Sequence, residues 1–148
     1  MAAAVWMDAV VHHLAISVQN IDKAVQFYRD YLGFQVEWDR RGIVSAEVVG
    51  LPDADARQIM LKGYGLRVEL FKYFTPKGQK IKPNRQCDFG ITHFALSVKD
   101  IHTIYQRLVE NGVQFNCPPL NFRPGAWATY LKDPEGIMIE LIEYTEAK

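Results

Sequence analysis

The stretch "VVHHLAISVQNI" (residues 10–21) returns in a second version, "GITHFALSVKDI", at residues 90–101. Both versions alternate between apolar residues and small or polar residues, which is typical of a strand with one buried face. A histidine begins the alternation each time, His13 in the first version and His93 in the second. Internal repetition of this kind indicates that one structural unit occurs twice. The matching histidines raise the question of whether the unit carries part of a functional site with it.

The residues after each version predict the same order of elements. Asn20 and Asp100 can each cap a helix whose apolar residues recur at helical spacing, and Gly33 and Gly112 can end these helices. Further strands are expected at 34–40, 43–49, 56–62 and 66–74 in the first half, and at 113–116, 127–133 and 137–144 in the second. Each half is therefore a strand, a helix and then about three strands.

The chain of 148 residues is expected to form a single domain over residues 1–148. Module one covers about 10–74, a linker rich in Pro, Gly and Lys covers 75–89, and module two covers about 90–144. A second loop, 117–126, is stiffened by prolines and is either functional or simply long.

Composition excludes several classes of protein. The 17 basic and 17 acidic residues cancel, so nothing favours a nucleic-acid partner. The apolar runs are too short to cross a membrane, and the N-terminus lacks the features of a signal peptide. Cys87 and Cys117 form no CxxC pair, so we expect free thiols in a reducing cytoplasm.

Each half also ends in a strand with a glutamate between apolar residues, Glu69 in "LRVELF" and Glu140 in "IMIELIE". A buried carboxylate is normally paired or bound to a metal, because leaving it alone costs several kcal/mol. His13, Glu69, His93 and Glu140 are therefore candidate ligands of one divalent metal ion. Nitrogen and oxygen donors of this kind suit Ni, Zn, Co, Mn or Fe. His12 and His102 lack this pattern and are expected to take no part.

The chain resembles the vicinal oxygen chelate superfamily, which includes glyoxalase I, methylmalonyl-CoA epimerase, extradiol dioxygenases, and bleomycin and fosfomycin resistance proteins. The resembling stretches are "HHLAISVQNIDKAVQFYRDYLGF", "LRVELF", "GITHFALSVKDI" and "DPEGIMIELIE". The resemblance implies an α+β fold in which two βαβββ modules pair into a cupped, half-open barrel around one metal ion. It places the four candidate ligands on the family's ligand positions, and it implies a homodimer.

Two subfamilies can be compared residue by residue. The ligand set and the "DPEGIMIELIE" ending match glyoxalase I, but its first-strand arginine, which helps bind glutathione, is replaced by Ser17. The stretch "RQIMLKGYGLRVELF" is similar to methylmalonyl-CoA epimerase, but one of that enzyme's two catalytic bases is replaced by Gln58. That enzyme also usually has glutamine where this chain has Glu69. An amide cannot take a proton from carbon, so Gln58 is expected to contact the substrate instead.

The resemblance implies a metal-dependent lyase or isomerase of the glyoxalase I type, or an epimerase. Such an enzyme binds a small molecule with vicinal oxygens, removes a proton beside the metal-chelated carbonyl and passes through an enediolate. Glu140, with Glu69 across the metal, is the expected base. Arg123 could pair with a substrate anion because its planar fork suits carboxylate and phosphate. Trp127, with Trp38, Phe71 and Phe122, could wall the cavity.

Two alternatives remain open. A protein of the same fold could sequester a small molecule or antibiotic without turnover and without a functional metal. A less favoured alternative is an iron-dependent extradiol-type dioxygenase, although Glu69 as a fourth ligand and the short chain argue against it. The basic residues of the linker could attract an anionic substrate or simply face solvent; they are Lys77, Lys80, Lys82 and Arg85.

Overall fold

The computed structural model describes residues 9–80 and 85–145, so Lys82 of the linker lies outside the described residues. Module one contains β1 (Leu14–Ser17), α1 (Ile21–Gln26), the π-helical turn η1 (Phe27–Tyr31), β2 (Gln35–Ile43), α2 (Ala46–Val49), β3 (Asp55–Gly63) and β4 (Leu66–Thr75). Module two contains β5 (His93–Ser97), α3 (Ile101–Glu110), β6 (Leu120–Arg123), β7 (Ala126–Lys132) and β8 (Met138–Tyr144).

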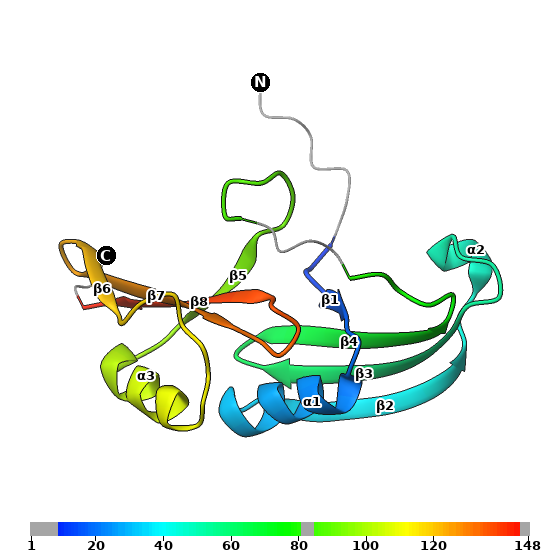
Figure 1. Cartoon of the computed structure of the whole chain (residues 1–148), viewed down its shortest axis with the longest axis horizontal. Helices are drawn as coiled ribbons and strands as arrows, with labels where there is room; N and C mark the ends of the chain where they lie inside the picture. The colour runs from blue at the N-terminus through cyan, green and yellow to red at the C-terminus, as the bar shows by residue number, and fades with distance from the viewer. Residues whose placement is uncertain (1–8, 81–84, 146–148) are drawn as a thin grey trace.

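The two modules form two four-stranded sheets with the same topology (Figure 1). The strand order is β1-β4-β3-β2 in one sheet and β5-β8-β7-β6 in the other. The first strand of each module runs parallel to the last, and the other pairs are antiparallel. The α+β fold with two βαβββ units predicted from the repeat is confirmed.

Some expected elements differ in the structure. A strand at 43–49 was wrong: β2 ends at Ile43, and Ala46–Val49 forms a helical turn. Alanine and glutamate favour a helix there, and Gly50, with a φ of 67°, ends the turn in the left-handed conformation. A strand at 113–116 was also wrong, because only Phe115 forms an isolated bridge in that stretch. The neighbouring strand is instead β6, inside the expected loop.

The two helix starts are capped by different side chains. The Asn20 side chain accepts a hydrogen bond from the Lys23 amide, as expected for an N-cap. The Asp100 side chain makes no such bond. The Glu143 carboxylate on β8 takes over this role and accepts from the backbone N–H groups of Asp100 and Ile101, at 2.9 and 3.0 Å.

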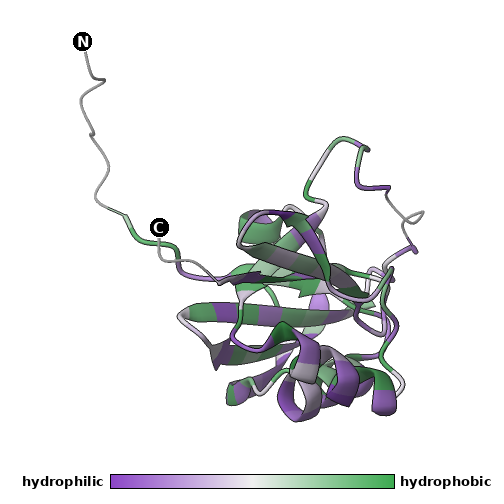
Figure 2. Ribbon diagram, turned by 90° about the vertical axis from the view of Figure 1, so that its left-hand side faces the viewer, coloured by the Kyte–Doolittle hydropathy of each residue, from purple (hydrophilic) through white to green (hydrophobic). Residues whose placement is uncertain are grey.

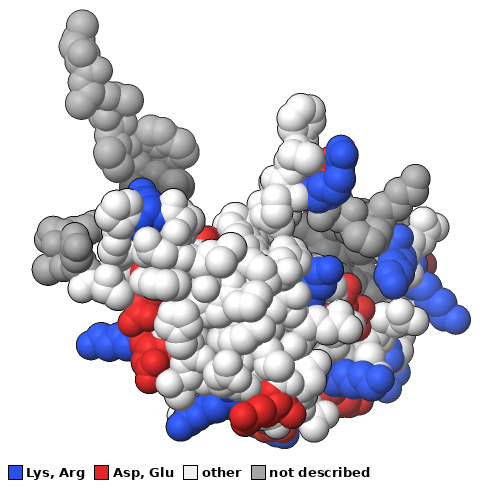
Figure 3. Space-filling view, turned by 60° about the vertical axis from the view of Figure 1, so that its left-hand side comes forward, with Lys and Arg blue, Asp and Glu red and all other residues white. Residues whose placement is uncertain are grey.

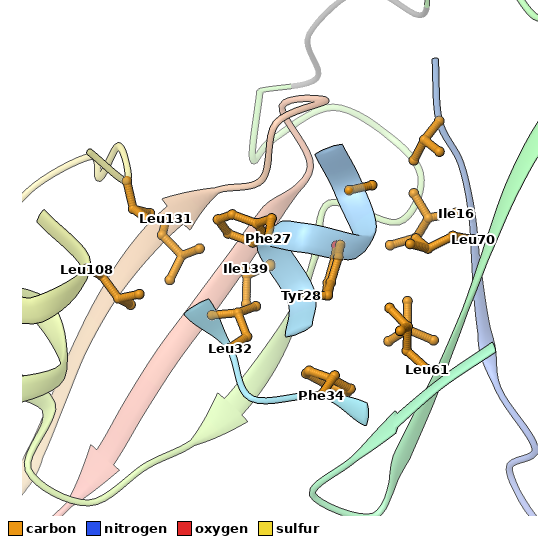
Figure 4. Packing of buried hydrophobic residues seen from close by; sticks show 14 of the residues in the cluster. Ile16, Phe27, Tyr28, Leu32, Phe34, Leu61, Leu70, Leu108, Leu131 and Ile139 are labelled. Carbon is orange, nitrogen blue, oxygen red and sulfur yellow. The ribbon is translucent and has the colours of Figure 1, made fainter. Parts of the chain in front are cut away.

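Hydrophobic and hydrophilic residues alternate along the strands (Figure 2), and because successive side chains point to opposite faces, this gives each sheet one apolar face. In module two, Leu131, Ile139 and Leu141 are buried, while Glu140 between them points the other way. The helical segment α1–η1 lies between the two sheets, and Phe27 and Leu32 point toward Leu131 and Ile139 (Figure 4). The modules therefore share a core on the helix-covered sides of their sheets.

Polar contacts reinforce this junction between the modules. The Tyr28 hydroxyl, on a fully buried side chain, donates to Asp133 Oδ2 at 3.1 Å. Asp133 Oδ1 accepts from the backbone N–H groups of Glu135 and Ile137, both at 2.8 Å. The Glu135 carboxylate in turn accepts from the backbone N–H of Asn20 at 2.8 Å. The "DPEG" turn of module two is thus attached to the first helix of module one.

Tyr28→Phe is expected to lower the free energy of unfolding by about 1–2 kcal/mol, because it removes a donor from a buried carboxylate. Urea unfolding of the parent and the variant measures this change. Tyr31→Phe is the matched control, since Tyr31 is partly exposed and makes a ring contact with Phe27 that phenylalanine keeps. Equal stability of the two variants would show that the buried hydrogen bond does not hold the junction.

Asp133 gives the junction a defined pH dependence. Burial raises the pKa of Asp133 above its ordinary value of 3.8, against the lowering effect of its hydrogen bonds. The folded protein therefore holds this proton to higher pH than the unfolded chain, so the contribution of Asp133 to stability is lost as pH rises through the folded pKa. The stability of the parent relative to Asp133→Asn is expected to fall as pH rises above the ordinary pKa of 3.8. A relative stability that rises over this range would contradict this.

Candidate metal centre

The first candidate pair lies on the open face of the first sheet. The parallel register of β1 and β4 sets Ala15 beside Glu69, which brings His13, just before β1, over that carboxylate. His13 Nε2 lies 3.0 Å from Glu69 Oε2. The Glu69 side chain is only 10% exposed and that of His13 34%, so the carboxylate is sheltered and the ring is reachable from solvent.

The second pair repeats this arrangement on β5 and β8. Ala95 is in register with Glu140, and His93 Nε2 lies 3.3 Å from Glu140 Oε2. Each sheet therefore holds one histidine and one glutamate at equivalent places, as the repeat predicted.

The other ring nitrogen of each histidine also has a partner. His13 Nδ1 lies 2.6 Å from His12 Nδ1, so one of the two rings must donate to the other. His93 Nδ1 lies 2.9 Å from Gln86 Oε1 and 3.0 Å from Thr92 Oγ1. His12, which was expected to lie on the opposite face, contacts His13: β1 begins at Leu14, so strand alternation does not hold His12 and His13 on opposite faces.

A tyrosine distinguishes the second pair from the first. Tyr130 is in register with Glu140, whereas the corresponding partner of Glu69 is Met60. The Tyr130 ring stands edge-on to His93, with 5.1 Å between ring centroids. Burial, followed by the charge of Glu140 and a hydrogen bond to it, raises the pKa of Tyr130. The phenol therefore stays protonated and can donate to Glu140, a polar contact that the sequence pattern alone did not single out.

The donor atoms fit a divalent metal ion. Two ligands about 2.1 Å from one ion and at right angles to each other lie about 3 Å apart. The His–Glu separations of 3.0 and 3.3 Å match this spacing. In both pairs Nε2 faces the carboxylate and Nδ1 has another partner, so an imidazole that donates from Nδ1 could bind a metal ion through Nε2.

One chain does not bring the two pairs together. Within residues 9–80 and 85–145, no group of three or more His, Cys, Asp or Glu side chains is close enough to hold an ion. The reason is the shared core: each sheet packs its helix-covered face inward and carries its His–Glu pair on the opposite face. A single chain therefore carries two His–Glu pairs that lie apart from each other.

The three expected substrate contacts lie in different places. Gln58 is in register with Phe71, on the face of the first sheet that carries Glu69. Arg123 is at the far end of the second sheet, where it donates to the Tyr144 hydroxyl at 3.1 Å. Trp127 lies on the helix-covered face and packs against His102, with 4.8 Å between ring centroids. The structure thus brings Gln58 to a His–Glu face and sets Trp127 on the opposite side of its sheet.

Comparison with known proteins shows the family of the chain. Residues 10–141 match the Glyoxalase/Bleomycin resistance protein/Dioxygenase superfamily, a range that contains all four candidate ligands. The chain belongs to this superfamily. The vicinal oxygen chelate fold expected from the family resemblance is therefore confirmed.

Individual relatives of this superfamily member include an enzyme of known activity. A 2-epi-5-epi-valiolone epimerase from Actinomyces sp. is 30% identical over 143 residues, which cover 89% of this chain and 78% of the relative. A glyoxalase family protein from Bacillus cereus has a TM-score of 0.87 at 21% identity, covering 98% of this chain and 100% of that one. The trypanothione-dependent glyoxalase I of Leishmania major has a TM-score of 0.64 at 21% identity, covering 88% and 84%.

The remaining expectations concern cysteines and the membrane. Cys87 is exposed and Cys117 partly buried, and both are free thiols. None of the helices in the described part of the chain has the length and apolar character needed to span a bilayer.

Proposed function

We propose that this protein is a divalent-metal-dependent enzyme that moves a proton at the carbon beside a carbonyl group, as an epimerase or isomerase of a small polyhydroxylated ketone. The observation that carries this proposal is the pair of equivalent His–Glu contacts at 3.0 and 3.3 Å. Two carboxylates contributed by two related modules provide one base for each face of a substrate held between them.

The complete site is formed between two copies of the chain. Each copy turns its two His–Glu faces away from its own core, so a site with four ligands needs module one of one copy and module two of the other. The surface on the side of module two carries a broad uncharged area with charged side chains around it (Figure 3). Exposed Leu120 and Phe122 belong to this module. A surface of this kind is suited to contact with a second copy.

Each residue of the site has a defined role in this proposal. An ion held by His13, Glu69, His93 and Glu140 would polarise the substrate carbonyl and acidify the neighbouring C–H bond. Glu140 accepts the proton from carbon while the electron pair moves to the carbonyl oxygen. Glu69 of the partner subunit, protonated at the start, gives its proton to the carbon from the opposite face as the electron pair returns from oxygen, and proton exchange with solvent restores both carboxyl groups. Gln58 orients a substrate hydroxyl through its amide.

Two observations favour a sugar-like ketone over a glutathione adduct. Ser17 lies on the open face of β1, in register with Phe71, and offers no cationic group to a glutathione carboxylate. The Actinomyces relative, named as an epimerase of 2-epi-5-epi-valiolone, is similar over 89% of this chain.

The test is to incubate the protein, loaded with Co²⁺, Zn²⁺ or Ni²⁺, with 2-epi-5-epi-valiolone in D₂O and follow the C–H signal beside the carbonyl by NMR. Exchange of that proton, with formation of an epimer, is expected. The hemithioacetal of methylglyoxal and glutathione is the parallel substrate. Turnover of the hemithioacetal alone would assign a glyoxalase reaction, and oxygen uptake with iron and a catechol would assign a dioxygenase. Tight binding of small molecules without metal or turnover would favour a sequestering protein.

A further inference from the structure

The linker between the modules contacts the second His–Glu pair. Gln86, three residues before the end of the linker, extends its side-chain oxygen to within 2.9 Å of His93 Nδ1. Its amide nitrogen donates to the Thr92 carbonyl in a long contact of 3.5 Å, which sets the orientation of the amide group. The neighbouring turn is fixed by Asp88, which accepts hydrogen bonds from the Arg85 amide and guanidinium at 2.8 to 3.2 Å.

This contact decides which nitrogen of His93 is free. The Gln86 oxygen can only accept, so the imidazole N–H must be at Nδ1. In the neutral ring Nε2 then carries the free electron pair that a metal ion binds, and it faces Glu140 Oε2 at 3.3 Å, as two ligands of one ion would. We infer that Gln86 is a positioning residue of the metal centre: it holds His93 in the tautomer and orientation in which Nε2 can bind the ion.

The inference rests on the proposed function and adds a residue to it. Gln86 belongs to neither of the repeated modules, so no residue equivalent to it is expected in module one. There the corresponding contact to His13 Nδ1 comes from the adjacent ring of His12. The two His–Glu pairs consequently have different supporting residues, and the ligand His93 depends on the segment that joins the modules.

The experiment compares Gln86→Ala with the parent in two measurements. Titration with Co²⁺, followed by its visible absorption, is expected to show affinity about 10-fold weaker in the variant, because partners of a ligating histidine contribute about 10- to 100-fold. In the metal-free protein at about pH 8, long-range ¹H–¹⁵N correlation reports which nitrogen carries the proton. Because Gln86 and Glu140 compete for the single proton of the neutral ring, the parent is expected to show a larger share of the Nδ1–H tautomer of His93 than the variant.

Two further variants separate this role from general damage to the linker. Gln79→Ala removes the same side chain from another exposed place in the linker and is expected to change neither measurement. Gln86→Glu keeps an oxygen acceptor and is expected to restore the tautomer. An unchanged tautomer and an unchanged Co²⁺ affinity in Gln86→Ala would overturn the inference. Failure of the parent to bind Co²⁺ would instead overturn the proposed function, and the tautomer would still decide whether Gln86 orients His93.

Discussion

His93→Ala is expected to weaken Co²⁺ or Zn²⁺ binding by at least about 100-fold, beyond the effect of removing an outer partner of a ligand. The substitution removes one of the two nitrogen donors of the proposed site and leaves Glu140 without the ring that faces it at 3.3 Å. The carboxylates that remain bind such ions less selectively than a site that includes imidazole. Titration of the purified, tag-free protein with Co²⁺ measures the change.

His102→Ala is the matched control for this variant. His102 lies on α3 and packs against Trp127 on the helix-covered face of the second sheet, away from the His–Glu pairs. Replacing His102 is expected to lower stability slightly, because the ring contact with Trp127 is lost, and to leave metal binding intact. Equal loss in the two variants would point to unfolding, and retention of metal in His93→Ala would remove His93 from the site.

Glu140→Gln is expected to lower turnover by about 1,000-fold, within the range that general bases contribute. The amide keeps an oxygen near His93 and Tyr130, so the shape of the site is preserved and Co²⁺ affinity is expected to fall by no more than about 10-fold. The side chain can no longer accept a proton from carbon. Loss of exchange of the C–H signal in D₂O, measured at saturating Co²⁺, separates this chemical loss from loss of metal.

Glu143→Gln makes the same change on the same strand but on the opposite side. The Glu143 carboxylate caps α3 by accepting from the backbone N–H groups of Asp100 and Ile101. Glutamine keeps one side-chain oxygen that can still accept from one of these groups. The turnover of this variant is expected to stay near that of the parent. Full exchange activity in Glu140→Gln would exclude Glu140 as the base, and loss of activity in Glu69→Gln alone would transfer the role to Glu69.

The repeat made most of the fold and the four candidate ligands predictable. His13, His93, Glu69 and Glu140 recur at equivalent places, and strand alternation sets each glutamate opposite to the buried residues around it. Local patterns failed where a distant group decides the outcome. The cap of α3 comes from Glu143, 43 residues after Asp100, so the sequence around Asp100 does not predict it.

Strand and helix periodicity also could not predict contacts made by side chains from irregular segments. Strand alternation predicts opposite faces for His12 and His13, but β1 begins only at Leu14, and Gln86 lies in a linker with no periodicity. The arrangement of the modules could not be predicted either. The periodicity of a strand tells which of its faces carries a ligand, but it does not tell whether two such faces meet within one chain or between two.

The measurement that most directly tests a site shared between two chains combines two defective variants. His13→Ala and His93→Ala are each expected to bind almost no Co²⁺. In a mixed dimer of the two, the intact His13 of one chain and the intact His93 of the other meet in one of the two sites. Co-expression with different tags and purification through both tags should therefore recover about one Co²⁺ per dimer. A mixed dimer that binds no Co²⁺ would contradict a site formed between chains, because sites within single chains would each lack a ligand.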